Sequence, residues 1–211
     1  MTDESSNKTD EWIAKAIERF PFHMELADGH ETGNIVSGIA RASFPYLWDR
    51  SKPIPPNTEG TYGINLVFPE DSDLSLLEAQ IKASVEAKWP NPKTRPKLKL
   101  PLKDQGEMTR FEGYNDGGRY VIATSRQNKP AVWDKQVQRM HEDRKDEVYP
   151  GCRVIATIRP FTYDKGVNRG VSFGLQEVQL VADDKRLGGF SGTGGAFSGV
   201  DLDNEEDEFF A

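Results

Sequence analysis

The sequence predicts a mainly β fold: a small, curved, five-stranded barrel with one helix inserted between its strands. Three observations lead to this prediction. Short runs of β-branched and aromatic residues, separated by glycine and proline, begin at about residue 33. Only one stretch of the chain has a clear helical repeat of apolar residues. The last strand changes phase part-way along its length, which is the effect of a β-bulge, and tightly curved sheets contain such bulges.

The first predicted elements are a short helix at 11–20 and strands at 34–44 and 60–68. Four apolar residues alternate along the second strand and share one face: Tyr62, Ile64, Leu66 and Phe68. The proline-rich stretch between the strands, 49–60, is predicted to be a loop because proline cannot pair inside a sheet.

The clear helical repeat lies in 71–90. Its apolar residues recur at helical spacing: Leu74, Leu77, Ile81 and Val85. Ser75 and Glu78 fit a capping box at the start, and Pro90 ends the helix. A basic, proline-rich stretch follows at 91–104.

Three further strands are predicted at 118–127, 152–163 and 170–181, while 133–148 fits either a polar helix or a long loop. One face of the second of these strands is apolar: Val154, Ala156 and Ile158. The other face carries Ile155 and polar residues, joined by two aromatic residues if the alternation continues through Pro160: Arg153, Thr157, Arg159, Phe161 and Tyr163. In the last strand, Val178 and Leu180 are out of phase with the earlier apolar residues Val171, Phe173 and Leu175.

The net charge of −7 is unevenly distributed along the 211 residues. Residues 201–208 contain six acids and no base; without these six, the 34 acidic residues fall to 28 against 27 basic ones. The first eleven residues hold four acids and one lysine. Both ends are therefore acidic, and the middle of the chain is mildly basic, about +2.

These changes in composition predict four parts of the chain. They are a disordered acidic arm at 1–11, a barrel domain at 12–187, a flexible Gly/Ser linker at 188–199 and an acidic partner-binding tail at 200–211. The polar N-terminus does not fit a signal peptide, and no apolar run approaches the length of a membrane span.

No pattern in the sequence points to catalysis. The single Cys152 excludes an internal disulfide and a cysteine-based zinc site, and His23, His30 and His141 do not have metal-ligand spacing. The "GTGG" at 192–195 lacks the Lys-Ser/Thr of a phosphate loop. We therefore expect a reduced, cytosolic protein that is not an enzyme and has no cofactor or metal. A nuclease whose carboxylates meet only in the folded chain stays open.

Basic and aromatic residues recur along the same strands and loops. Cations neutralise phosphates, and aromatic rings stack on unpaired bases of any sequence, so this combination favours binding of single-stranded nucleic acid. A single ring in a barrel is more often part of the core, and a single Arg or Lys is usually solvated surface; alternation that places both on one strand face favours binding. The candidates are Arg153, Arg159, Phe161, Tyr163, Lys165, Arg169, Tyr120, Arg126, Trp89, Lys97, Lys99, Tyr114 and Trp133.

The stretch "YPGCRVIATIRPFTYDKGVNRGVSFGLQEVQLVADDKRLGG" at 149–189 resembles a family of bacteriophage single-stranded DNA-binding proteins. The similarity covers roughly 34–189 and includes "ARASFPYLWD", "INLVFPEDSD" and "KPAVWD". Its most specific residues are Tyr149, Gly151, Cys152, Phe161, Tyr163, Gly170, Val171 and Leu175. The resemblance implies an oligonucleotide/oligosaccharide-binding (OB) barrel. It also implies sequence-independent binding of single-stranded DNA in phage replication, recombination and repair, in the cytoplasm of the infected bacterium.

Proteins of this type often carry an acidic tail with an aromatic residue at or near its end, which recruits replisome proteins such as DNA polymerase or helicase-primase. The matching residues here are Asp201, Asp203, Glu205, Glu206, Asp207, Glu208, Phe209 and Phe210. Ala211 follows them, whereas a terminal aromatic is the commoner form. The acidic run also mimics phosphates, so we expect it to compete with DNA for a basic groove. A homodimer is left open.

Two other functions compete with this interpretation. The first is a metal-dependent phage nuclease or resolvase, which a cleavage assay on single- and double-stranded DNA would reveal. The second is a protein-interaction adaptor, tested by a mobility shift with a chain that ends at Gly199. If tail and DNA compete, removal of the tail tightens DNA binding.

Overall fold

The computed structural model describes residues 15, 18–25, 33–53, 55, 57–108, 114 and 118–187. Within these residues, nine strands join in one sheet, accompanied by one complete α-helix and two 3₁₀ helices, and Lys15, Glu18 and Arg19 are also helical. The strands are β1 (His23–Glu25), β2 (Asn34–Val36), β3 (Ala40–Tyr46), β4 (Tyr62–Val67), β5 (Leu102–Asp104), β6 (Arg119–Ser125), β7 (Ala131–Trp133), β8 (Arg153–Lys165) and β9 (Asn168–Ala182). The helices are α2 (Ser75–Lys88), η1 (Gln105–Met108) and η2 (Glu142–Glu147).

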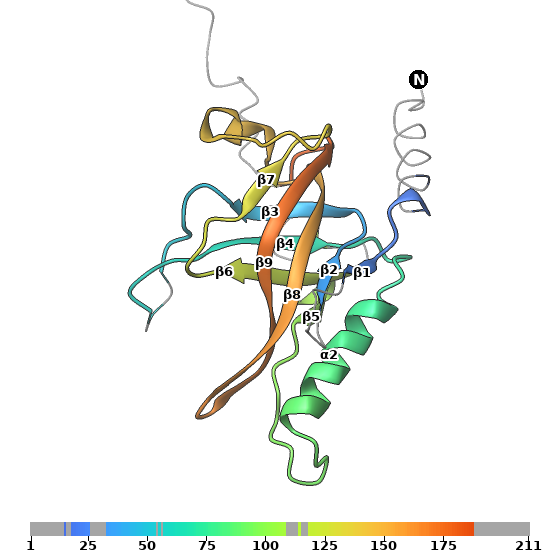
Figure 1. The fold of residues 1–211 in the computed structure, drawn as a ribbon, viewed down its shortest axis with the longest axis vertical. Coiled ribbons are helices and arrows are strands. Elements are labelled where there is room, and N and C mark those ends of the chain that lie inside the picture. The colour runs from blue at the N-terminus through green and yellow to red at the C-terminus, as the bar shows by residue number, and fades with distance from the viewer. Residues whose placement is uncertain are drawn as a thin grey trace, which may run out of the picture.

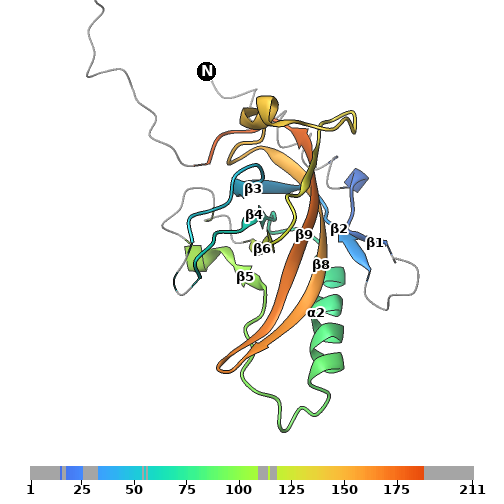
Figure 2. The same ribbon diagram turned by 60° about the vertical axis from the view of Figure 1, so that its left-hand side comes forward.

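Five strands pair in a closed ring, in the order β3, β4, β6, β9, β8 and back to β3. All of these pairings are antiparallel except that between β6 and β9, which is parallel. The helix α2 is inserted between β4 and β6 and lies beside the lower half of β8 and β9 (Figures 1 and 2). A small five-stranded ring with this mixed pairing is the OB architecture, so the predicted fold class is confirmed.

The barrel core is built from alternating apolar residues, as the strand patterns predict. The predicted face of β4 is buried at Ile64, Leu66 and the following Phe68, which pack with β6, β8 and β9. The helix contributes Leu77, Ile81 and Val85 to the same core. Because these residues recur every three or four positions, they lie along one side of α2 and attach it to the barrel.

Several boundaries differ from the prediction. The strand predicted at 34–44 divides into β2 and β3, which both pair with β8 but have different second neighbours, β1 and β4. Between them, the Ser37 hydroxyl accepts a hydrogen bond from the backbone N–H of Ala156 (2.9 Å). The predicted capping box is wrong: Ser75 is the first residue of α2, and its N–H is bound by Asp73 Oδ1 (3.0 Å). Residues 133–148 form a loop with the short helix η2 rather than an α-helix.

The strands β8 and β9 form a long hairpin that extends well beyond the barrel (Figure 1). Their register shifts where Thr157 faces Glu177 but Ile158 faces Leu175, so Gln176 is the extra residue. This confirms the phase change predicted in the last strand. The extra residue lets Val171, Phe173 and Leu175 before it and Val178 and Leu180 after it face the same core.

The predicted acidic arm, the linker and the tail lie outside the described residues, as does most of the helix predicted at 11–20. Within the described part of the chain, no helix is both long and apolar enough to cross a membrane.

One carboxylate organises the turn after β7. Asp134 Oδ1 accepts hydrogen bonds from the N–H groups of Gln136 and Gln138 (2.9 Å each), and its Oδ2 accepts one from Arg144 (3.0 Å). The bond from Gln138 is the largest cause that lowers the pKa of Asp134 below its usual value. Such a group stabilises the fold at pH values above its unfolded pKa of about 3.9, and that stability is lost as the pH falls through the lower folded pKa.

We therefore expect Asp134→Asn to reduce the free energy of unfolding at neutral pH and to flatten its decline on acidification. Urea unfolding at a series of pH values between about 5 and 2 measures both effects. The matched control is Asp143→Asn, an exposed carboxylate in the neighbouring η2. If the free energy of unfolding fell equally with pH in the Asp134 variant and the natural chain, the stabilising role of this carboxylate would be contradicted.

Candidate nucleic-acid interface

A groove of about 640 Å³ lies between the end of β6 and the β8–β9 hairpin. Its lining brings together four of the predicted binding residues, Arg126, Phe161, Tyr163 and Lys165. Arg126 belongs to the loop after β6, whereas the other three belong to β8. The fold thus joins, in one open depression, segments that are far apart in the sequence.

Alternation along β8 explains why the rings face this groove. Phe161 lies opposite Ser172, and Tyr163 lies opposite Gly170. These small partners do not cover the rings, and the Phe161 side chain is 45% exposed. Two flat side chains on one strand face, spaced by two residues, form a surface on which unpaired bases can stack.

Gly170 also fixes the neighbouring basic segment. A Cβ at this position would lie 2.1 Å from the carbonyl oxygen of Lys99, so only glycine permits the close approach. The Lys99 N–H donates to Arg169 O (2.9 Å), and its carbonyl accepts from Val171 N–H (3.1 Å). Lys97 and Lys99 are exposed on this segment, beside the hairpin but outside the groove.

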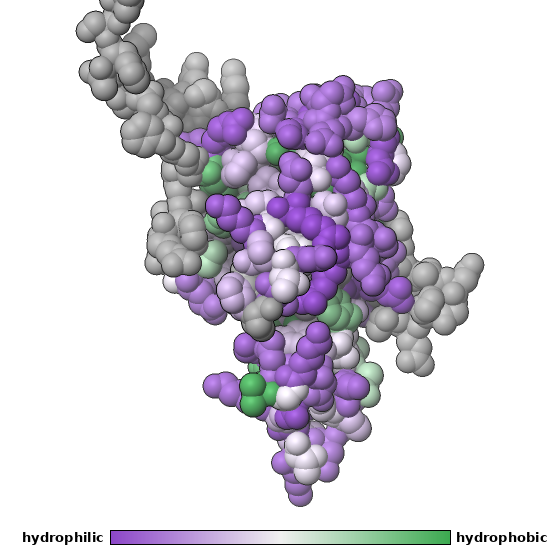
Figure 3. Space-filling view, turned by 90° about the vertical axis from the view of Figure 1, so that its left-hand side faces the viewer, coloured by the Kyte–Doolittle hydropathy of each residue, from purple (hydrophilic) through white to green (hydrophobic). Residues whose placement is uncertain are grey.

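A second depression, of about 350 Å³, continues the path toward the loop between β3 and β4. Arg126 lines both depressions, and Arg50 lines the far side of the second. The Arg50 guanidinium lies 5.2 Å from the centre of the Tyr62 ring and is paired with Glu59 (3.1 Å). In an OB barrel the ligand-binding loops join the first two and the last two strands, which here are the β3–β4 loop and the β8–β9 turn. Figure 3 views the molecule from this side and shows a largely hydrophilic surface.

Several residues that line the two depressions are not indicated by the sequence: Arg50, Gln127, Asn128 and Ser172. The available signal is the proline-rich loop at 49–60. Once its flanking strands are placed as the first two of an OB barrel, this loop is expected beside the binding face.

The cations of the groove differ in how far their charge is neutralised. Among the described residues, no carboxylate is ion-paired with Arg126 or Lys165. Arg169, by contrast, donates to Asp164 Oδ1 at 2.6 Å across the hairpin end. Arg126 and Lys165 are therefore the groove cations best placed to attract phosphates.

Two predicted tyrosines lie in the core instead. Tyr114 and Tyr120 are 0% and 1% exposed and pack edge-to-face, with their ring centres 5.3 Å apart. The Tyr114 hydroxyl accepts a hydrogen bond from Asn65 (2.9 Å), and burial is the main cause that raises the pKa of both phenols. A ring without an exposed face cannot stack on a base, so neither residue belongs to the proposed interface.

Arg153 is also buried, at 7% exposure, and donates to Asp184 Oδ2 at 2.6 Å. Its charge holds β8 to the segment after β9, which is a structural role. Trp133 donates to Glu177 Oε2 (2.6 Å), and Arg139 lies over its ring at 5.4 Å. Trp89 packs on the core at the end of α2 and accepts two hydrogen bonds from Arg95 through its carbonyl. Neither tryptophan lines the groove.

Residues 33–210 match the protein-family model described as Enterobacter phage Enc34, ssDNA-binding protein. The chain belongs to this family. The family predicted from the stretch at 149–189 is therefore confirmed. No curated protein sequence matches the chain.

Solved structures of phage single-stranded DNA-binding proteins have the same fold. The single-stranded DNA-binding protein from bacteriophage Enc34 in complex with ssDNA has 19% identity and a TM-score of 0.65, over 78% of this chain and 98% of that one. Its C-terminal truncation has 21% identity and a TM-score of 0.60, over 77% and 97%. The single-stranded DNA-binding protein gp2.5 of bacteriophage T7 has 18% identity and a TM-score of 0.52, over 71% and 92%. At these identities the likeness establishes the fold.

No group of three or more His, Cys, Asp or Glu residues that would suit a metal ion occurs in the described part of the chain. Cys152 is buried, and burial raises the pKa of its thiol to about 11. A thiol in this environment is protonated at neutral pH and is a poor nucleophile.

Proposed function

We propose that this chain binds single-stranded DNA without sequence preference and without catalysis. The observation that carries the proposal is the groove between β6 and the β8–β9 hairpin, where Arg126 and Lys165 flank the exposed face of Phe161 and Tyr163. Membership of the Enc34 family and the fold shared with a relative solved in complex with ssDNA support it.

The proposed mechanism combines charge and stacking. Phosphates of the strand lie against Arg126 and Lys165, and unpaired bases stack on the rings of Phe161 and Tyr163. The path continues past Arg126 toward Arg50. Since the contacts are to the backbone and to the flat faces of bases, they do not depend on base identity.

The test is the salt dependence of binding to an oligo-dT strand. We expect affinity to fall steeply with salt, and Arg126→Ala to reduce the slope of log K against log salt by roughly 0.7–1, because one phosphate contact is lost. The matched control is Arg139→Ala, which removes an exposed arginine that stacks on Trp133 outside the groove. Salt-independent binding, or equal slopes for the two variants, would contradict the proposal.

We further propose a role in phage DNA replication, recombination and repair in the cytoplasm of the infected host. In this role the tail from Asp201 to Phe210 recruits replisome proteins such as DNA polymerase or helicase-primase. The family match extends to residue 210 and so includes this tail. The four predicted parts of the chain and a homodimer remain predictions, which light scattering and limited proteolysis would test.

A further inference from the structure

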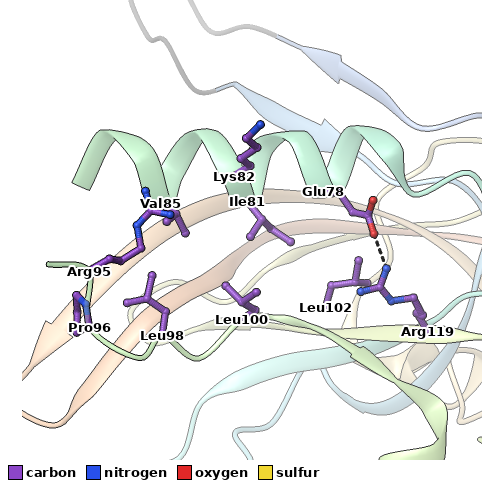
Figure 4. Close-up of a pocket in the computed structure, with 10 residues that line it drawn as sticks. All are labelled: Glu78, Ile81, Lys82, Val85, Arg95, Pro96, Leu98, Leu100, Leu102 and Arg119. Carbon is purple, nitrogen blue, oxygen red and sulfur yellow. Dashed lines mark hydrogen bonds and ion pairs between the residues drawn. The ribbon is translucent and has the colours of Figure 1, made fainter. Parts of the chain in front are cut away.

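A second groove, of about 450 Å³, runs between α2 and the extended segment 95–102 (Figure 4). Its floor and walls are apolar, and the residues that form them are Ile81, Val85, Pro96, Leu98, Leu100 and Leu102. Ile81 and Val85 point from the helix toward Leu98 and Leu100 on the opposite wall (Figure 4). Leu100 is 51% exposed, so a large apolar side chain faces solvent here.

The segment that forms one wall of this groove is strongly basic. Residues 87–103 contain six cations and no acid: Lys88, Lys93, Arg95, Lys97, Lys99 and Lys103. Of these, Lys103 is paired with Glu107 (3.9 Å), and Arg95 is held by two hydrogen bonds to the carbonyl of Trp89 rather than by a carboxylate. At the other end of the groove, Arg119 pairs with Glu78. The surroundings of the apolar floor are therefore positive.

The acidic end of the same chain has the complementary pattern. Residues 201–208 contain six acids and no base, and Phe209 and Phe210 follow directly. Two large rings need an apolar surface to leave water, and the acids beside them need cations. The groove beside α2 offers both, whereas the DNA groove offers cations around rings that are themselves exposed.

The tail is long enough to reach this groove. Phe209 lies 22 residues after Leu187, the last described residue. A chain of that length extends to about 75 Å at most, which exceeds the ~30 Å diameter of a small domain more than twofold. Residues 188–199 include six glycines and two serines, a composition typical of linkers.

We propose that Phe209 and Phe210 dock in the apolar groove between α2 and residues 95–102 of their own chain, with the preceding acids along the basic segment. The docked tail keeps its two rings covered until a partner protein takes them. This inference does not depend on DNA binding. It assigns the resting tail to a surface separate from the proposed DNA groove, in place of the competition with DNA expected from the charge of the tail alone.

The test uses the full chain with a nitroxide spin label on Ala211→Cys. Cys152 is buried and its pKa is raised to about 11, so the introduced cysteine is the reactive one. We expect methyl signals of Ile81, Leu98 and Leu100 to lose most of their intensity in paramagnetic NMR spectra, and to recover at about 1 M salt, where the acids are screened. Absence of broadening, or broadening confined to the face of Phe161 and Tyr163, would overturn the proposal.

Two variants of the labelled chain act as a matched pair. Leu100→Glu places a negative charge on the groove wall and is expected to abolish the broadening at Ile81 and Leu98. Val137→Glu makes the same change at another exposed apolar residue, which is 64% exposed and lies outside the groove, and is expected to leave it intact. Broadening that survives Leu100→Glu would show that the tail does not dock there.

A mixture distinguishes docking on the same chain from docking on a second copy. Spin-labelled protein without NMR isotopes is added to isotope-labelled protein without the spin label. We expect the methyl signals of Leu98 and Leu100 to keep their intensity in this mixture. Broadening equal to that of the sample in which one chain carries both labels would assign the tail to a neighbouring copy and would overturn the assignment within one chain.

Discussion

Phe161→Ala is expected to weaken binding to oligo-dT by about 5- to 150-fold, because stacking of one base on an aromatic ring contributes about 1–3 kcal/mol. Phe161 is the most exposed ring of the groove, at 45%, and lies opposite the small Ser172. Removal of an exposed side chain costs little folding free energy, so the loss reports on DNA rather than on the fold. A fluorescence or mobility-shift titration at fixed salt measures it.

The control for this prediction keeps the ring and changes its identity. Phe161→Trp retains a flat, exposed aromatic face and is expected to bind oligo-dT within a few-fold of the natural chain. The thermal unfolding midpoint of each variant should match that of the natural chain, which confirms that the barrel is intact. If Phe161→Ala binds as tightly as Phe161→Trp, the base does not stack on this ring and the proposed path is misplaced.

The strand face that carries Phe161 was predictable because alternation is a local rule. It required the pattern of β8 to continue through Pro160, and the structure shows why it does. Pro160 pairs with Phe173 on one side, while the pairing of β8 with β2 ends at Ile158. Among the described residues, Pro160 therefore lies where β8 has no second neighbour, and its missing N–H costs no ladder hydrogen bond.

Tyr120 and Arg153, which were predicted for the interface, are buried instead. The residues that cover them cannot be identified from the sequence pattern. Tyr120 has the outward phase of β6, but Tyr114 and Asn65 belong to a packed layer that covers that face. Arg153 has the phase of Arg159, yet Asp184 from beyond β9 reaches it. In both cases the covering residue comes from a distant part of the chain, and only the folded structure brings it near.

For a related reason, the sequence could not predict that Arg126 and Arg50 line one depression. The sequence indicates Arg126 by its charge alone and does not single out Arg50. Their shared depression depends on how the loops after β3 and β6 approach each other at one end of the ring. Loop approach follows from strand order and closure, which the alternation of single strands does not determine.

Gly151→Ala is expected to be strongly destabilising, because Gly151 is the one described glycine that combines a positive φ with a close backbone contact. Gly151 has φ +113°, a conformation that L side chains rarely adopt, and a Cβ there would lie 2.2 Å from the carbonyl oxygen of Lys185. Backbone strain costs about 1–3 kcal/mol and steric overlap about 1–3 kcal/mol, so the expected loss is roughly 2–6 kcal/mol. The free energy of unfolding in urea measures it directly.

Two other glycines separate the causes of this loss. Gly166 has φ +62°, but a Cβ added there would have no atom within 4 Å, so Gly166→Ala should show the strain without the overlap. Gly106 has neither feature, and Gly106→Ala should change the free energy of unfolding by no more than about 0.5 kcal/mol. Since Gly151 N–H donates to Ala42 O (2.8 Å) and Leu187 N–H to Pro150 O (2.8 Å), overlap at Gly151 would push the segment before the linker away from the ring. A cost for Gly151→Ala no larger than that for Gly166→Ala would mean that the segment at Lys185–Leu187 moves aside without loss of stability.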